Sequence, residues 1–168
     1  MSDGRYVVMG VSGCGKSLIG AMLAARLGAI FHDGDDLHPP ANVAKMARGT
    51  PLTDADRAPW LDEVGRVLRV PNIVVACSAL RRIYRARITE AAGAPVTFLY
   101  LRGTRATLQA RVSNRPGHFM PAALLDSQLA TLEEPGPEER AVTADIEQPP
   151  DAVVAALIAG LQAEGAPS

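Results

Sequence analysis

The sequence predicts an α/β fold in which helices cover both faces of a mostly parallel sheet of five strands. Short apolar runs alternate along the chain with longer helical segments, and parallel strands joined through helices form right-handed crossovers. The chain has 168 residues, the size of one domain, and it contains neither an internal repeat nor a long linker. We therefore expect a single three-layered domain that spans residues 1–168.

The five expected strands are short apolar runs, the last of them the weakest. In chain order they lie at residues 6–9, 29–32, 73–77, 96–101 and 141–146. The expected helices are longer segments with helical periodicity. They lie at residues 17–27, 40–48, 53–69, 80–92, 104–115, 122–132 and 151–162. Thr53 and Asp56 have the spacing of a capping box, and a segment rich in Pro and Gly, residues 115–121, separates two of the helices.

The composition excludes several classes of protein. Seventeen basic and 18 acidic residues give a net charge of −1, so no broad basic surface is expected to bind nucleic acid or an anionic membrane. The longest apolar run, residues 152–161, is half of the ~20 residues that a membrane span requires. The N-terminus has no signal-peptide core, and Cys14 and Cys77 form no disulfide framework. We therefore expect a cytoplasmic protein.

A phosphate-binding loop is predicted directly after the first strand. The pattern G-x-x-x-x-G-K-[ST] is matched by Gly10, Val11, Ser12, Gly13, Cys14, Gly15, Lys16 and Ser17. Glycines at these positions let successive backbone N–H groups face one anion, and the following helix directs its positive end to the same point. Lys16, one of only two lysines, would reach the β- and γ-phosphates of ATP, and the Ser17 hydroxyl would bind Mg²⁺.

Other motifs narrow the class of phosphate-loop protein. The guanine-binding pattern N-K-x-D of GTPases is absent, and the one match to D-x-x-G, Asp62 to Gly65, falls within an expected helix. The strand at 73–77 is followed by Ser78 and Ala79, so it supplies no Walker B carboxylate. A second protein contact to the metal must therefore come from another element.

An acidic turn, Asp33-Gly34-Asp35-Asp36, closes the second strand. Because that strand follows the first in chain order, we expect the turn beside the phosphate loop. Three neighbouring carboxylates repel one another unless a cation or hydroxyl groups offset their charge. A kinase that phosphorylates a hydroxyl needs one carboxylate for the acceptor and another for metal-bound water, tasks that Asp33 and Asp35 would divide. A solvated turn is the alternative.

Taken together, these motifs resemble the gluconokinase family over nearly the whole chain. Besides the phosphate loop, the match rests on residues 31–39, 42, 45–52, 54–61, 77–80, 84–85, 115–119, 128, 132–135 and 145–146. The resemblance implies ATP-dependent phosphorylation of the 6-hydroxyl of D-gluconate, which gives 6-phospho-D-gluconate. It also implies the fold of the nucleoside monophosphate kinases, a mobile lid at about residues 112–122 and a homodimer. Asp36 and Arg81 depart from the family pattern.

The same resemblance distributes roles among the site residues. Asp35 would bind and polarise the acceptor hydroxyl, as in the related shikimate kinases, and Asp33 would hold Mg²⁺ through water. A gluconate carboxylate needs a cation, for which Arg57 and Arg85 are the candidates. The remaining expected contacts are made to the acceptor or to phosphate by basic side chains. They are His38, Lys45 and His118. Arg111 and Arg115 resemble the lid arginines that lie over the γ-phosphate, and Arg115 is the favoured catalytic one.

Three hypotheses about function remain open at this stage. The first is a gluconate kinase, and the second is a kinase of the same fold that acts on another hydroxyl acceptor, such as shikimate or a nucleoside monophosphate. The third is a module that binds ATP without turning it over. Two further expectations concern single residues: Trp60 packs in the core, and Cys14, at a helix N-terminus, has a lowered pKa and is oxidisable.

Overall fold

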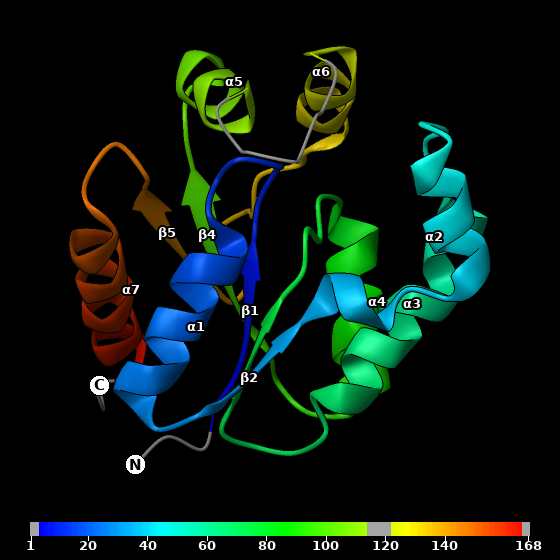
Figure 1. The fold of residues 1–168 in the computed structure, drawn as a ribbon. Helices are drawn as coiled ribbons and strands as arrows, with labels where there is room; N and C mark the ends of the chain where they lie inside the picture. Colours follow the sequence, from blue (N-terminus) through cyan, green and yellow to red (C-terminus); the bar gives the residue numbers. More distant parts are fainter. Residues whose placement is uncertain (1–3, 114–121, 166–168) are drawn as a thin grey trace.

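The computed structural model describes residues 4–113 and 122–165, in which five parallel strands form one sheet. The strand order is β2-β3-β1-β4-β5 (Figure 1). In chain order the strands are β1 (Arg5–Met9), β2 (Ile30–Asp33), β3 (Ile73–Ala76), β4 (Thr97–Arg102) and β5 (Ala141–Asp145). The prediction of a parallel five-stranded α/β sheet is therefore confirmed.

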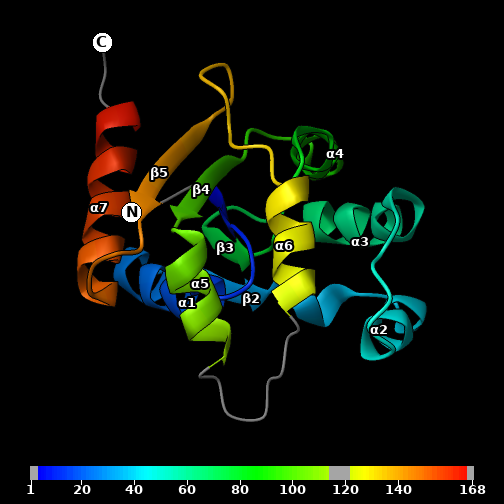
Figure 2. The ribbon, with the colours of Figure 1, turned by 90° about the horizontal axis from the view of Figure 1, so that it is seen from above.

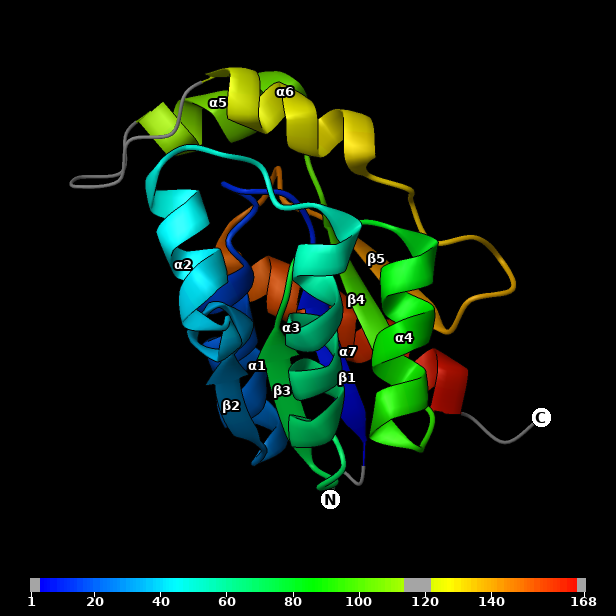
Figure 3. The same ribbon diagram turned by 90° about the vertical axis from the view of Figure 1, so that its right-hand side faces the viewer.

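Helices lie on both faces of the sheet and above the carboxyl ends of its strands. They are α1 (Lys16–Leu27), α2 (Pro40–Ala47), α3 (Asp54–Val67), α4 (Arg82–Ala92), α5 (Arg105–Ser113), α6 (Ala122–Thr131) and α7 (Pro150–Gly165), with a 3-10 helix η1 (Gly34–Leu37) after β2. Figure 2 shows α1 and α7 on one side of the sheet and α3 and α4 on the other. In Figure 3, α5 and α6 lie across the top of the molecule.

Successive residues of the central strand β1 divide the hydrophobic core into two. Val8 packs with side chains of α1 and α7, such as Leu23 and Leu157, on one face of the sheet. Val7 belongs to the cluster on the other face, which includes Val64 of α3. Because side chains alternate along a strand, a continuous apolar run is buried on both sides. The three layers expected from the sequence follow from this arrangement.

The order of the strands in the sheet differs from their order in the chain. The second strand does not lie beside the first, because β3 pairs with both β1 and β2 and separates them. The acidic turn nevertheless reaches the phosphate loop, since Val8 and Asp33 are both in register with Ala76 and the two strands end at the same edge. The predicted lid lies largely outside the described residues, as do Arg115 and His118. In the described part of the chain, every helix is too short or too polar to cross a membrane.

Candidate active site

The phosphate loop has the backbone conformation that its glycines permit. Gly10, Gly13 and Gly15 have φ angles of 148°, 87° and 91°, in the region that favours glycine. A Cβ added at Gly13 would lie 2.8 Å from the backbone oxygen of Leu108, so the close approach of α5 also requires glycine there. The Lys16 ammonium donates to the Val11 carbonyl at 3.3 Å, and Lys16 lines a cavity.

Asp33 links the phosphate loop to the acidic turn. The Ser17 hydroxyl donates to Oδ2 of Asp33 at 2.8 Å, and the backbone N–H of Asp35 donates to Oδ1 at 3.0 Å. One carboxylate therefore caps η1 and accepts a hydrogen bond from Ser17, near the start of α1. Two oxygen ligands side by side suit Mg²⁺, which takes its other ligands from phosphates and water. Within the described ranges there is no cluster of three or more His, Cys, Asp or Glu side chains arranged to hold a metal.

The turn that carries Asp35 is held by β3 and α3. A Cβ added at Gly34 would lie 2.3 Å from the Ala76 oxygen, so only glycine lets the turn pass this closely over β3. The indole N–H of Trp60 donates to the Gly34 carbonyl at 2.8 Å, and its ring stacks on His38 with centroids 4.1 Å apart. Trp60 is buried, as the sequence predicted, and it also positions the turn.

A network of polar side chains joins α2 to the start of α3. The Asn42 amide lies 3.3 Å from Nδ1 of His38 and donates to the Asp56 carbonyl at 2.9 Å. The Lys45 ammonium donates to Asp56 at 2.5 Å and holds the pKa of that carboxyl at about 2. The predicted capping box between Thr53 and Asp56 is confirmed. Lys45 therefore pairs with Asp56 instead of lining the cavity, whereas His38 lines it, with a pKa lowered by burial.

Arg57 lies on the cavity wall and is held by an aromatic partner. Its Nη1 donates to the Tyr84 hydroxyl at 3.1 Å, and its guanidinium lies 5.3 Å from the centre of that ring. The Tyr84 hydroxyl in turn donates to Asp54, which also accepts from Arg81 at 3.0 Å. These contacts fix the Arg57 side chain while part of its charged head stays accessible from the cavity.

One cavity of about 460 Å³ brings these parts together. It lies between the phosphate loop, η1, α2 and α3 on one side and α6 on the other. Of the predicted site residues, Ser12, Lys16, Asp35, His38 and Arg57 line it.

Sequence reasoning gave no role to Gln128, which also lines this cavity and whose side-chain oxygen accepts the backbone N–H of Ser12 at 2.7 Å. The spacing of Leu124, Ser127, Gln128 and Thr131 on α6 was the available signal, because it puts these residues on one helix face.

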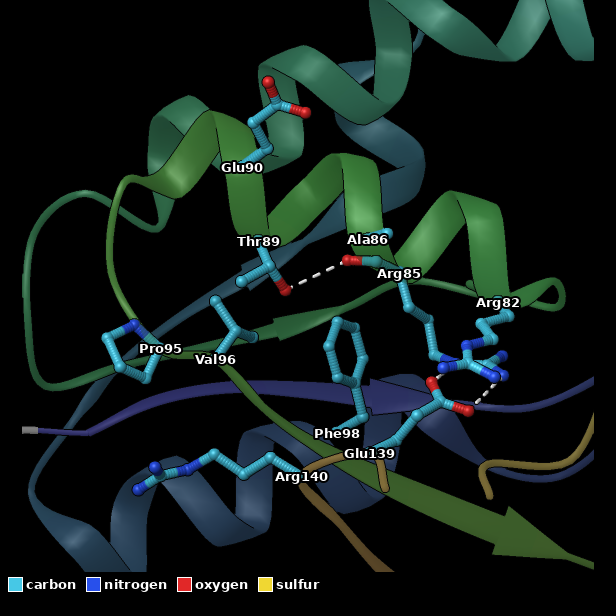
Figure 4. A pocket seen from close by; sticks show the side chains of 10 residues that line it. All are labelled: Arg82, Arg85, Ala86, Thr89, Glu90, Pro95, Val96, Phe98, Glu139 and Arg140. Atoms are coloured by element: carbon cyan, nitrogen blue, oxygen red, sulfur yellow. Dashed lines mark hydrogen bonds and ion pairs between the residues drawn. The ribbon is translucent and has the colours of Figure 1, made fainter. Parts of the chain in front are cut away.

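The structure separates Arg85 from this cavity. Its guanidinium is buried, donates to both carboxylate oxygens of Glu139 at 2.6 and 3.1 Å, and donates to the Ala79 carbonyl at 2.8 Å. Figure 4 shows this pair at the wall of a second cavity of about 600 Å³, which no phosphate-loop residue lines. The expectation that Arg85 contacts the acceptor is therefore corrected. The Arg85 guanidinium forms an ion pair with Glu139 and lowers the pKa of that carboxyl.

Cys14 also differs from expectation. Its thiol is buried in the core beside Val11, and burial raises its pKa, although the nearby Lys16 charge acts in the opposite direction. The predicted lowered pKa was wrong because desolvation of the thiolate outweighs the effect of the helix N-terminus.

Arg111 donates to the Ile146 carbonyl at 2.9 Å, which ties α5 to the loop after β5.

A family model and known proteins are similar to this chain over most of its length. Residues 6–135 match a family described as an AAA domain. The chain is 49% identical to the gluconokinase of Gluconobacter oxydans (strain 621H) over 163 residues, which cover 94% of this chain and 91% of that protein.

Solved structures give the same result. A crystal structure of a gluconokinase from Sinorhizobium meliloti 1021 matches with a TM-score of 0.90 at 47% identity, over 96% of this chain and 93% of that one. A shikimate kinase from Aquifex aeolicus vf5 matches with a TM-score of 0.64 at 14% identity, over 96% of this chain and 99% of that one, and shares the P-loop kinase fold alone. With this fold, this cavity and relatives this similar over almost their whole length, the chain belongs to the gluconokinase family.

Proposed function

We propose that this protein transfers the γ-phosphoryl group of ATP to the 6-hydroxyl of D-gluconate, which gives ADP and 6-phospho-D-gluconate. The observation that carries the proposal is a single cavity lined both by phosphate-loop residues, Ser12 and Lys16, and by acceptor-side residues, Asp35 and Arg57. The gluconokinases similar to this chain support the choice of gluconate as the acceptor.

The phosphate loop accounts for the nucleotide end of the reaction. Backbone N–H groups of Gly13, Gly15, Lys16 and Ser17, at the N-terminus of α1, bind the triphosphate, and the Lys16 ammonium neutralises charge on the β- and γ-phosphates. We assign Mg²⁺ to Ser17 and Asp33, whose oxygens already lie together. When bound, the ion neutralises negative charge on the β- and γ-phosphate oxygens. Arg111 and Arg115 are the proposed arginines that close over the γ-phosphate.

The acidic turn accounts for the acceptor end. Asp35 orients the 6-hydroxyl and accepts its proton while that oxygen forms its bond to the γ-phosphorus and the bond from the γ-phosphorus to the ADP oxygen breaks. Arg57 binds the gluconate carboxylate through its fork of donors. His38 and, outside the described residues, His118 are proposed contacts to the acceptor hydroxyls. Because the chemistry consists of positioning and charge neutralisation, rigid support of the turn by Trp60 serves catalysis directly.

We also propose a homodimer and a cytoplasmic location. The family resemblance supports the dimer, and two free, buried cysteines, Cys14 and Cys77, fit a reducing compartment. Light scattering coupled to gel filtration measures the oligomeric state.

A coupled assay of ADP release with a panel of acceptors tests the reaction. Turnover with gluconate, and not with shikimate or nucleoside monophosphates, is expected. Turnover only with another acceptor would select the second hypothesis, a kinase of the same fold with a different substrate. Nucleotide binding without turnover of any acceptor would select the third, a nucleotide-binding module.

A further inference from the structure

One backbone donor of the phosphate loop is already occupied by a side chain from a distant helix. The Ser12 N–H donates to Oε1 of Gln128, 116 residues further along the chain, at 2.7 Å. Gln128 lies on the face of α6 that lines the cavity, which Asp35 and Arg57 also line. This side chain therefore contacts the phosphate loop and lines the same cavity as the residues assigned to the acceptor.

The bond to Ser12 fixes which way the Gln128 amide is oriented. A backbone N–H can only donate, so the amide oxygen must face the loop and the amide nitrogen must occupy the other position. Among the residues that the structure describes, that nitrogen has no hydrogen-bond partner, while the side chain lines an open cavity. Two N–H donors are thus available to a ligand, and they come from a neutral group.

Two other cavity-lining residues of α6, Leu124 and Thr131, do not offer the same function. Leu124 is apolar, and the Thr131 hydroxyl is turned back to donate to the Ser127 carbonyl of its own helix at 2.9 Å. A neutral donor suits the hydroxyl oxygens of an anionic polyol, because it binds them without competing with Arg57 for the carboxylate. A carboxylate in this place would repel both the acceptor and the phosphates.

We propose that Gln128 is a specificity residue whose amide nitrogen donates to a hydroxyl of the acceptor, while its oxygen locks the side chain to the phosphate loop. The inference rests on the proposed function for the identity of the acceptor, gluconate. The bond to Ser12 gives the acceptor wall a fixed position relative to the loop that holds the phosphoryl group.

Two variants separate the two ends of the amide. Gln128→Met keeps the volume and removes both polar atoms, whereas Gln128→Glu keeps an oxygen for the Ser12 N–H and loses the donor. We expect Gln128→Met to raise the KM for gluconate about tenfold and Gln128→Glu to raise it about a hundredfold, because the added charge repels the acceptor. In both variants the KM for ATP should rise less than the KM for gluconate, because the triphosphate is held mainly by Lys16 and the backbone of the loop.

A matched control is Gln162, an exposed glutamine near the end of α7. Gln162→Met and Gln162→Glu should match the wild type in both KM values, and thermal unfolding of all four variants checks that they fold. If Gln128→Met fails to fold, Gln128→Ala removes the same two polar atoms and takes its place, because the charge added in Gln128→Glu repels the acceptor by itself.

Two results would overturn the inference. In the first, the KM for gluconate stays within about twofold of the wild type in both Gln128 variants. In the second, Gln128→Met raises only the KM for ATP and Gln128→Glu restores it, which would make Gln128 a support of the loop and nothing more.

Failure of the proposed function gives a different result. If the wild type turns over only another acceptor, gluconate is the wrong substrate, and the same comparison of KM values on that acceptor still decides the role of Gln128. Titration calorimetry of gluconate, with a nonhydrolysable ATP analogue present, gives the comparison independently of turnover. Equal gluconate affinity in the wild type and both variants would then refute the role of Gln128 and leave the proposed function intact.

Discussion

The two ends of the cavity are built in different ways. The nucleotide end comes from one continuous stretch, Gly10 to Ser17, in which backbone groups do most of the binding and glycines set the conformation. The acceptor end is assembled from segments far apart in the chain: the Gly34 turn is held by Trp60, and Arg57 is held by Tyr84. A short motif therefore identifies the first end, while the second depends on contacts that form only when α3 and α4 pack on the sheet.

The largest effect is expected at the nucleotide end. Lys16→Ala should lower kcat about a thousandfold, because the charge that develops on the transferred phosphoryl group loses its ammonium partner. The far-ultraviolet circular dichroism spectrum and the melting temperature should stay close to those of the wild type, since Lys16 makes one long bond to the loop. A rate near that of the wild type would show that this loop does not hold the reacting phosphate.

At the acceptor end, Asp35→Asn should lower kcat about a hundredfold or more, because an amide cannot accept the hydroxyl proton. Nucleotide affinity, measured by titration calorimetry, should be preserved. Asp36→Asn is the matched control: this neighbouring carboxylate is exposed and does not line the cavity, so kcat should change by less than about twofold. Equal losses in the two variants would contradict the assignment of Asp35.

The two arginines considered for the gluconate carboxylate should behave differently. Arg57→Ala should raise the KM for gluconate about tenfold to a hundredfold and leave the KM for ATP nearly unchanged, because a charge-assisted pair is lost. Arg85→Ala should instead lower the free energy of unfolding by about 3–5 kcal/mol, because Glu139 keeps an unpaired charge in a mostly buried site. Steady-state kinetics and urea unfolding of both variants measure the contrast, and a selective KM effect in Arg85→Ala would reverse it.

The smallest effect is expected on stability at low pH, through Asp56 at the start of α3. The pKa of Asp56 is lowered from 3.8 to about 2 in the fold, so as the pH falls the unfolded chain takes up this proton first. Asp56 therefore contributes stability at neutral pH that is lost as the pH falls from about 5 to about 2. In urea unfolding, the free energy of unfolding should fall less steeply over this pH range in Asp56→Asn than in the wild type. Identical slopes would mean that the pair with Lys45 has no part in acid stability.

Much of the fold was accessible from the sequence because its signals are local. The five apolar runs and the helical segments between them gave the sheet and its layers, and Thr53 and Asp56 gave the start of α3. The position of β3 between β1 and β2 was missed, since chain order carries no information about which strands pair. Cys14 was misjudged for a related reason: its place at a helix N-terminus is visible in the sequence, and its burial is not.

The order of residues alone was enough for the phosphate loop, because a loop of eight consecutive residues needs only its own glycines and the next helix to bind an anion. The acceptor wall was settled by packing. Arg57 and Arg85 are the same type of residue, and the sequence offered both for the gluconate carboxylate. In the fold, Arg57 lines the cavity, whereas Arg85 is buried against Glu139. Gln128 contacts Ser12 across 116 residues of sequence, a distance over which no local pattern carries information.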